Sequence, residues 1–269
     1  MAEPTLPSGV AVDFGGTKIA ASRVRSGRIV GALRMTTDGD APAERQVEAI
    51  CGLLGELNVE PTERVGVAVA GRVDASGTWH ALNTETLTRV QAVPLRAMLS
   101  ERLGRAVTVQ NDAIAAAVGE HLAGAGRGAA RFGFITVSTG VGGGILLDGR
   151  PVISASGLAG HVGFTTSRLS AGRCGSGRVG TVENAAGGRA IAAAAAGLGH
   201  DGHDAKRVFE AHLAGEAWAS ALITRSARAV AELCANLAAI LDLERVALGG
   251  SIGLEDGYAA QVTAALAEE

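Results

Sequence analysis

The stretch VAVDFGGTK at residues 10–18 decides how the rest of the chain is interpreted. It is a short apolar run that ends in a Gly-Gly turn, and a second apolar run follows at residues 19–24. A stretch of the same design, FITVSTGVGGG, returns at residues 134–144 and leads into the apolar residues 145–147. A unit that is repeated once over such a distance predicts two similar halves rather than a solenoid of short repeats.

A glycine turn at the end of a strand is suited to binding phosphate. Glycine lets the backbone approach a ligand and take positive φ, and successive exposed N–H groups form a concave anion site. We expect Gly15 and Gly16 to supply such groups, with the Thr17 hydroxyl and the Lys18 charge beside them. Asp13, at the strand end, could hold a magnesium ion through water. These residues also suit an ordinary hairpin. The presence of two such turns favours the interpretation that they hold one polyphosphate between them.

The composition narrows the class of protein. With 269 residues, 47% of them hydrophobic, the chain can form one large domain or two of ordinary size. Its net charge of −3 provides no basic surface for nucleic acid. No signal peptide precedes Val10 and no apolar run is long enough to span a membrane, so we expect a cytoplasmic protein without membrane partners. The scattered Cys51, Cys174 and Cys234 predict free thiols.

Predicted strands and helices alternate along the chain, which indicates an α/β fold. Strands are expected within residues 10–35, 65–70, 106–109, 132–153 and 245–248, and helices at residues 42–57, 94–103, 113–122, 183–196, 218–241 and 257–267. A glycine-rich loop is expected at residues 157–180. We place the boundary between a smaller domain, residues 1–112, and a larger one, residues 113–269, next to Asp112.

Asn111 and Asp112 stand where a predicted strand ends and a predicted helix begins. Either residue type is a favoured helix N-cap, so a purely structural role is one interpretation. The other is that Asp112 accepts the proton of a substrate hydroxyl that attacks the γ-phosphate of a nucleotide, a reaction that needs mainly positioning and charge stabilisation. Asn111 would then orient the substrate, and Asn83, which follows an apolar pair, could do the same.

Three familiar motifs do not apply. Residues 175–180 match G-x-G-x-x-G but follow a polar loop, so the strand that a dinucleotide site requires is absent. Residues 249–253 match the hydrolase pattern G-x-S-x-G, but the last histidine, His212, precedes Ser251, whereas that fold places its His after the Ser. No G-x-x-x-x-G-K-[ST] occurs, which excludes a P-loop enzyme.

Together these residues resemble the ROK family of sugar kinases and repressors, whose fold belongs with those of actin and hexokinase. The match covers nearly the whole chain. It is carried by DFGGTK (13–18), NDA (111–113), STGVGGG (138–144), the loop through Glu183, and LGGS (248–251). The resemblance implies a hexokinase-like ATPase fold of two ribonuclease H-like domains with a cleft between them, in which the first domain carries phosphate loop 1 and the second carries phosphate loop 2 and the adenosine site.

Within the family the chain is most similar to bacterial N-acetylmannosamine kinases, through FITVSTGVGGG (134–144), GLAGHVG (157–163) and GSIGL (250–254). This similarity implies that ATP, with Mg²⁺, phosphorylates the sugar 6-hydroxyl in amino-sugar or sialic acid breakdown, and that Asp112 is the base. The implied sugar ligands are Asn83, Asn111, His161 and Glu183. The implied nucleotide-site residues are Asp13, Gly15, Gly16, Thr17, Lys18, Thr139, Gly140, Gly142 and Gly250.

Two departures from the family pattern matter. Most members carry a structural zinc bound by one His and three Cys, and the residues at these positions are Phe164, Cys174, Ser176 and Thr181. Because hydroxyls replace thiolates poorly in such a site, we predict no zinc. Relatives also generally continue into a further helix that returns to the first domain, whereas this sequence ends at Glu269. We therefore expect either that this helix is dispensable or that packing between the domains is weaker without it.

Other functions stay open at this point. A kinase of glucose, N-acetylglucosamine or another hexose is a close alternative, because a few buried polar contacts redirect sugar specificity. A non-catalytic sugar-binding protein is another, although Asp13, Lys18, Asp112 and Glu183 are all retained. A repressor would need a DNA-binding domain ahead of Val10, where nine residues stand. Because family members are commonly dimers, we expect a homodimer.

Overall fold

The computed structural model describes residues 6–82, 87–174 and 176–269, which form two compact units. The first unit comprises Met1–Ala115 and the later segment Ile153–Ala159, and the second comprises Ala116–Val152 and Gly160–Glu269. The candidate sugar ligand Asn83 lies outside the described residues. A domain boundary at residue 112 stays a prediction, and the segment Ile153–Ala159 is a return to the first unit that the sequence did not indicate.

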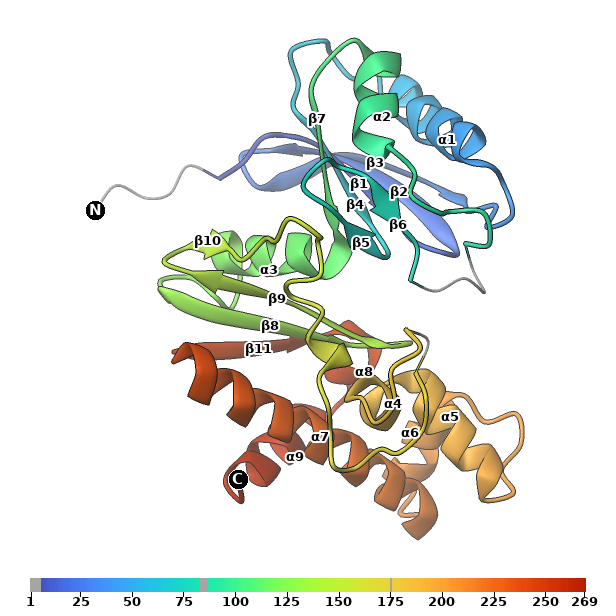
Figure 1. Cartoon of the computed structure of the whole chain (residues 1–269), viewed down its shortest axis with the longest axis vertical. Coiled ribbons are helices and arrows are strands. Elements are labelled where there is room, and N and C mark those ends of the chain that lie inside the picture. Colours follow the sequence, from blue (N-terminus) through green and yellow to red (C-terminus); the bar gives the residue numbers. More distant parts are fainter. Residues whose placement is uncertain (1–5, 83–86, 175) are drawn as a thin grey trace. The chain divides into compact units, whose positions relative to one another are not determined.

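The first unit is built on a five-stranded sheet in the order β3-β2-β1-β4-β7 (Figure 1). Its strands are β1 (Gly9–Phe14), β2 (Lys18–Arg25), β3 (Arg28–Thr36), β4 (Val65–Val69) and β7 (Val107–Asn111). The first three form the predicted meander, and β1, β4 and β7 run parallel. Val10, Val12 and Phe14 alternate with polar or small residues on β1 and are buried, as the period of two along a strand requires.

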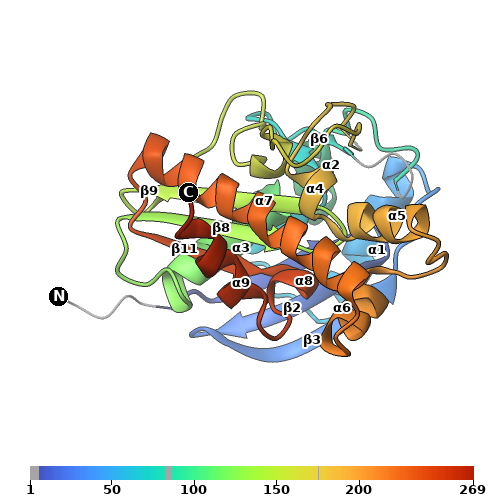
Figure 2. The ribbon, with the colours of Figure 1, turned by 90° about the horizontal axis from the view of Figure 1, so that it is seen from below.

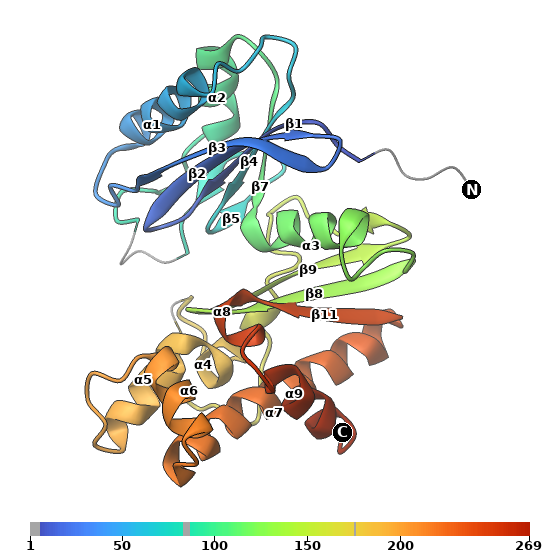
Figure 3. The ribbon, with the colours of Figure 1, turned by 180° about the vertical axis from the view of Figure 1, so that it is seen from behind.

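Two helices, α1 (Ala43–Glu56) and α2 (Leu95–Leu103), pack on each other and on one face of this sheet (Figures 1 and 3). The helical spacing of Val47, Ile50 and Leu54 puts these side chains in the core of the unit, as predicted. Gly104, in the left-handed region at φ 62°, ends α2. A small hairpin of β5 (Arg72–Val73) and β6 (Trp79–His80), which the sequence analysis did not predict, extends from the end of β4.

The second unit has a four-stranded sheet in the order β10-β9-β8-β11. Its strands are β8 (Arg131–Val137), β9 (Val141–Leu147), β10 (Arg150–Pro151) and β11 (Arg245–Gly249). The turn between β8 and β9 is the second glycine stretch, as the turn between β1 and β2 is the first. The order β3-β2-β1-β4 of the first sheet therefore corresponds to β10-β9-β8-β11, and the prediction of two similar halves is confirmed.

Helices cover both faces of the second sheet. The helix α3 (Asp112–Ala123) packs on one face through Ala117 and Phe132, and α7 (Ala217–Leu241) and α9 (Tyr258–Leu266) pack on the other (Figures 2 and 3). The remaining elements are η1 (Val162–Phe164), α4 (Glu183–Ala186), α5 (Gly188–Gly197), α6 (Ala205–Leu213) and α8 (Gly250–Gly253). In the part of the chain that the structure describes, no helix has both the length and the apolar character needed to cross a membrane.

The helix predicted at residues 183–196 is two helices, α4 and α5, which Gly187 separates. Gly187 has extended backbone angles, and a Cβ there would lie 3.1 Å from Gly140 Cα and 3.2 Å from the Thr139 carbonyl. The break lets the chain pass next to the second glycine turn. The helix α6 was not predicted, although Asp204 caps it by accepting the backbone N–H of Arg207 at 2.9 Å.

Candidate functional site

The candidate residues of the first unit lie at the carboxyl edge of its parallel strands. Phe14 of β1 is opposite Val69 of β4, which is in turn opposite Asn111 of β7. Asp13 precedes the end of β1 and Asp112 follows the end of β7, so the two carboxylates lie at one edge of the sheet. Ligands of open parallel sheets bind outside this edge, since the loops that follow the strands gather there.

The first glycine turn is closed by a hydrogen bond from the Gly15 N–H to the Lys18 carbonyl at 2.9 Å. Thr37 holds it from the next segment: its hydroxyl donates to the Gly15 carbonyl at 2.7 Å and its N–H to the Thr17 carbonyl at 3.0 Å. Neither Gly15 nor Gly16 has positive φ. Their contribution is the missing side chain, which leaves the turn backbone open to a ligand.

Asn111 is the N-cap of α3. Its Oδ1 accepts the backbone N–H of Ile114 at 3.0 Å, and its Nδ2 donates to the Gly71 carbonyl at 2.9 Å and to Asp112 Oδ1 at 2.8 Å. The side chain is buried, and both amide hydrogens have partners. The structure therefore gives Asn111 the structural role that the sequence left open for either residue, and Asn111 orients its neighbour.

Asp112 is held by two hydrogen bonds that Oδ1 accepts, from Asn111 Nδ2 and from the backbone N–H of Ala113, both at 2.8 Å. Asp112 is exposed, yet enough protein replaces water around it to raise the pKa of its carboxyl. The hydrogen bonds with Ala113 and Asn111 oppose this rise in pKa, and the negative charge of Asp13 adds to it. Desolvation also raises the pKa of Asp13, against the effect of Lys18.

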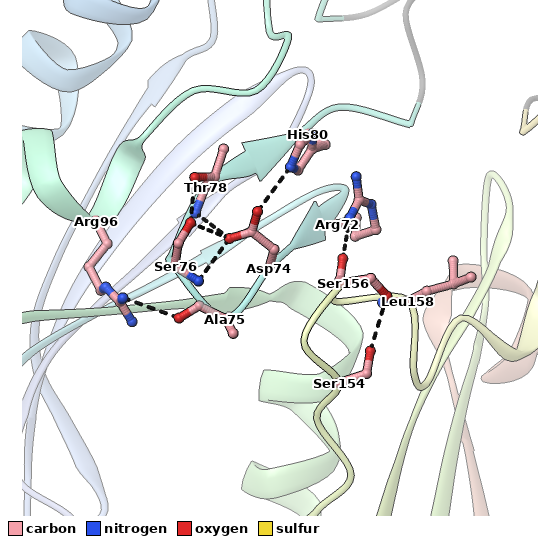
Figure 4. A network of polar contacts seen from close by, with 10 residues as sticks. All are labelled: Arg72, Asp74, Ala75, Ser76, Thr78, His80, Arg96, Ser154, Ser156 and Leu158. Atoms are coloured by element: carbon pink, nitrogen blue, oxygen red, sulfur yellow. Dashed lines mark hydrogen bonds and ion pairs between the residues drawn. The ribbon is translucent and has the colours of Figure 1, made fainter.

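Gly71, whose carbonyl accepts the hydrogen bond from Asn111 Nδ2, immediately precedes the β5–β6 hairpin. Asp74 organises the turn of this hairpin (Figure 4). Asp74 Oδ1 accepts the N–H groups of Ser76 at 2.9 Å and Thr78 at 3.0 Å, and Oδ2 lies 3.3 Å from His80 Nε2. The hydrogen bonds from Ser76 and Thr78 hold the pKa of Asp74 below its usual range. The hairpin is therefore an ordered support for Asn111.

The segment Ile153–Ala159 fastens this hairpin from the other side (Figure 4). The Ala75 N–H donates to the Ala155 carbonyl at 3.0 Å, and the Arg72 guanidinium donates to the Ser156 carbonyl. A Cβ on Gly157 would lie 2.0 Å from the Val73 carbonyl oxygen, so only glycine allows this approach. This segment leads along the chain to the candidate sugar ligand His161.

The second glycine turn, in the second unit, is surrounded by helix starts and further glycines. The N–H groups of Gly188 and Arg189, at the start of α5, donate to the Ser138 carbonyl at 2.7 Å and the Thr139 carbonyl at 3.1 Å. Ser138 Oγ is 3.0 Å from Ser251 Oγ, in α8. Thr139 and Gly140 thus lie beside the start of α8, whereas Gly142 is already within β9, opposite Thr136.

Gly250 begins α8 with φ 88°, and a Cβ there would lie 2.3 Å from the Val137 carbonyl oxygen. Both the backbone angle and the contact with β8 require glycine at this position. The structure therefore places Gly250 against the end of β8, which leads into the turn at Thr139 and Gly140. Sequence reasoning gave no role in the site to Ser138, Gly187, Gly188 and Ser251, because only the fold shows that they border the same turn.

Glu183, the first residue of α4, reaches this turn as well. Its Oε2 accepts the Val141 N–H at 3.2 Å, and a Cβ on Gly140 would lie 2.4 Å from the same oxygen. Desolvation raises the pKa of Glu183, while the Val141 N–H and the Arg189 guanidinium, 4.0 Å away, oppose the rise. A carboxylate predicted for the sugar thus also contacts the predicted phosphate turn.

His161 precedes η1, and small residues fix its position. A Cβ on Gly143 would lie 2.6 Å from Val162 Cγ2, and one on Gly163 would lie 1.9 Å from the Val141 carbonyl oxygen, so η1 packs closely on β9. The His161 ring stacks on the Phe164 ring, with centroids 5.7 Å apart. Phe164, at the position where the resemblance implies a zinc-binding histidine, is therefore packed against a candidate sugar ligand.

The other three positions of the family's zinc site lie close together. Cys174 Sγ is 2.9 Å from Ser176 Oγ. Burial alone would raise the pKa of the Cys174 thiol, but hydrogen bonds with Ser176 and Thr181 hold this pKa below its usual value. One thiol and two hydroxyls are a poor donor set for structural zinc. Among the described residues, no three His, Cys, Asp or Glu side chains gather as metal ligands would.

A model of the ROK family matches residues 9–269, and the chain belongs to this family. It is similar to the N-acetylmannosamine kinase of Haemophilus influenzae (strain PittEE), with 39% identity over 252 residues, which are 93% of this chain and 82% of that protein.

Two solved structures are similar over 97% of this chain and 88% of their own chains. One is the ROK hexokinase from Thermus thermophilus, with 32% identity and a TM-score of 0.84. The other is a ROK family glucokinase from Streptomyces griseus, in complex with glucose and AMPPNP, with 31% identity and a TM-score of 0.76. The predicted α/β, hexokinase-like fold is thereby confirmed.

Proposed function

We propose that the chain is an ATP-dependent sugar kinase that phosphorylates the 6-hydroxyl of N-acetylmannosamine. The observation that carries this proposal is the division of work between two neighbours. Asn111 caps α3 and holds Asp112 from one side, so the Asp112 carboxylate is oriented but is not needed as the cap. Its position at the carboxyl edge of the sheet and its raised pKa are those of a residue that handles a proton.

In the proposed reaction, Asp112 accepts the proton of the sugar 6-hydroxyl as the hydroxyl oxygen attacks the γ-phosphorus of ATP. The new P–O bond forms while the bond between the γ-phosphorus and the bridging oxygen of ADP breaks, and ADP leaves with that electron pair. An aspartate is sufficient as the base, because phosphoryl transfer depends mainly on positioning and on charge stabilisation. The proton is later released from Asp112 to water.

The remaining roles are assigned by position. In the first unit, the turn at Gly15, Gly16 and Thr17, with Lys18, would contact phosphate oxygens, and the exposed Asp13 carboxylate fits a water-mediated magnesium site. Magnesium that accompanies ATP would neutralise charge on the phosphates.

In the second unit, Thr139, Gly140 and Gly250 would approach the nucleotide, with Gly142 behind them. His161 and Glu183 would contact the sugar. Asn83 keeps the same proposed role, and Asn111 would contact the sugar only through the lone pair of Oδ1 that Ile114 leaves available.

N-acetylmannosamine is proposed as the substrate because the H. influenzae relative bears that name at 39% identity over most of both chains. Glucose is the second candidate, because the similar S. griseus glucokinase was solved with glucose bound. His161 and its stacking partner Phe164 are the residues at which we expect this choice to be made.

The proposed hydroxyl is tested with the 6-deoxy analogue of N-acetylmannosamine. We expect the analogue to inhibit phosphorylation competitively and to yield no phosphosugar, because it keeps the binding groups but lacks the nucleophile. ³¹P NMR of the normal product should show a single phosphate ester coupled to the protons on C6. Turnover of the 6-deoxy analogue would contradict the assignment of the 6-hydroxyl.

A further inference from the structure

The segment between η1 and α4, residues 165–182, joins two candidate sugar ligands, since His161 precedes it and Glu183 follows it. It contains little regular structure: among the described residues, two isolated bridges, Thr166 with Thr181 and Arg173 with Val179, pair its two halves. In Figure 1 the segment, in yellow, extends to α7 and returns to α4. Its position must therefore be set by contacts with the rest of the unit.

One such contact is made by Glu232, an acidic residue on the buried side of α7. Only 7% of its surface is exposed, and neighbours on the helix such as Ala229 and Leu233 belong to the apolar core. Glu232 Oε2 accepts the hydroxyl of Ser167 at 2.6 Å, and Oε1 lies 2.6 Å from Arg168 Nε. Both partners of this buried carboxylate come from consecutive residues of the segment.

The two partners contribute differently. Ser167 is 2% exposed, so its bond with Glu232 is made away from water, where an ionised acceptor forms short and strong hydrogen bonds. The Arg168 side chain is 70% exposed, so its ion pair is screened and is expected to be weaker. A buried carboxylate without partners is costly. Docking of the segment on α7 is therefore the arrangement that satisfies Glu232.

Backbone hydrogen bonds connect Ser167 to the residues that precede Glu183. The Ser167 N–H donates to the Gly180 carbonyl and the Val182 N–H donates to the Thr165 carbonyl, both at 2.9 Å. Val182 is buried and immediately precedes Glu183. A shift of Ser167 away from α7 would therefore pull on the residues that place the Glu183 carboxylate against the second glycine turn.

We propose that Glu232 is a positioning residue for the sugar site, which anchors residues 165–182 on α7 and thereby fixes Glu183. This role rests on the proposed kinase function. It gives the segment a purely protein-based anchor, next to the Cys174, Ser176 and Thr181 positions that lack a zinc-binding set of donors.

The test compares Glu232→Gln and Ser167→Ala, which each remove one side of the contact, with Val230→Ala, which removes two methyl groups from a fully buried position on the same helix. For the first two variants we expect the sugar KM to rise about tenfold, while kcat and the KM for ATP stay within about threefold. The double variant should be little worse than either single variant, because both remove one link. Val230→Ala should lower Tm and leave the sugar KM unchanged.

Hydrogen–deuterium exchange supplies a readout that does not depend on activity. We expect faster exchange at residues 165–182 in Glu232→Gln and Ser167→Ala, but not in Val230→Ala. A sugar KM that is unchanged in both variants, with or without a loss of Tm, overturns the positioning role. If the wild-type chain phosphorylates no sugar, the proposed function fails instead, and unchanged exchange at residues 165–182 then overturns the anchor itself.

Discussion

At the scale of single residues, Asn111 and Asp112 divide two tasks that their sequence position could not separate. Both are common helix caps, and only the hydrogen bonds reveal that Asn111 takes the cap and the Gly71 carbonyl while Asp112 is held beside it. Asp112 is thus identified as the candidate base because Asn111 already serves as the helix cap. The division predicts opposite consequences for the two side chains.

Replacing Asp112 by Asn should lower kcat about 10²- to 10⁴-fold, the usual range for loss of a general base. Stability should not fall. Because the pKa of Asp112 is raised in the folded chain, the carboxyl favours folding at low pH and this contribution is lost as pH rises through the raised pKa. At pH 7 the neutral Asn should therefore leave the unfolding free energy unchanged or slightly raise it.

Asn111→Ala is the matched variant, and it should lose about 2 kcal/mol of unfolding free energy or more, because it removes the cap and leaves the Gly71 carbonyl without its donor. Denaturant unfolding of both variants beside the wild type measures this difference. A large destabilisation by Asp112→Asn, with Asn111→Ala unaffected, would reverse the assignment.

The pH dependence of kcat/KM should report the same carboxyl. Asp112 must be ionised to accept a proton, so activity should rise with pH, and the midpoint of this acid limb should lie above the ordinary pKa of an aspartate. Because the charge of Asp13 contributes to that raised pKa, Asp13→Asn should move the midpoint to lower pH, even though we also expect it to weaken ATP binding. A midpoint that stays in place or moves upward in Asp13→Asn would contradict the coupling.

At the scale of elements, the strands and the long helices could be predicted from the sequence because each carries its own periodicity. The β1–β3 meander, α1 and α7 appear where that periodicity placed them. The β5–β6 hairpin and the break at Gly187 could not be predicted, since both depend on contacts with distant segments: Ala155 for the hairpin and Gly140 for the break. The site follows the same rule. The motifs identified its loops, but only the fold shows that the loop at Ser138 lies beside the one at Ser251.

At the start of α8, a comparison of two glycine substitutions separates the effect of backbone strain on stability from an effect on nucleotide binding. Gly250→Ala combines positive φ with a contact of 2.3 Å to Val137, whereas Gly257→Ala, at φ 80°, meets nothing within 4 Å. Both variants should lose about 1 kcal/mol or more of unfolding free energy through backbone strain. Only Gly250→Ala should also raise the KM for ATP, by about tenfold. Equal KM values for ATP in the two variants would exclude Gly250 from the nucleotide site.

At the scale of the whole molecule, the two units share one strand order around their glycine turns, but they carry different candidate residues. The first unit holds the candidate base and the second holds the candidate sugar carboxylate Glu183. The loop that most relatives are expected to fix with zinc is fixed here by hydrogen bonds with α7 and within itself.

Metal analysis tests this last point. After dialysis against a chelator and return to excess Mg²⁺, we expect less than about 0.1 zinc per chain, an unchanged Tm and full activity, because Cys174 is the one thiolate ligand left of the family's set. Mass spectrometry measures the zinc content, a thermal melt measures Tm, and ADP release measures the activity. Zinc that remains near one per chain, or a lower Tm after chelation, would contradict a zinc-free loop.

The central claim is the reaction itself, and ADP release from Mg-ATP tests it most directly, with N-acetylmannosamine, N-acetylglucosamine and glucose compared side by side and Asp112→Asn as the blank. We predict that kcat/KM is highest for N-acetylmannosamine and that Asp112→Asn lowers sugar-dependent release about 10²- to 10⁴-fold. A preference for glucose or N-acetylglucosamine would contradict the proposed substrate. No sugar-dependent release from the folded wild-type chain would contradict the kinase function.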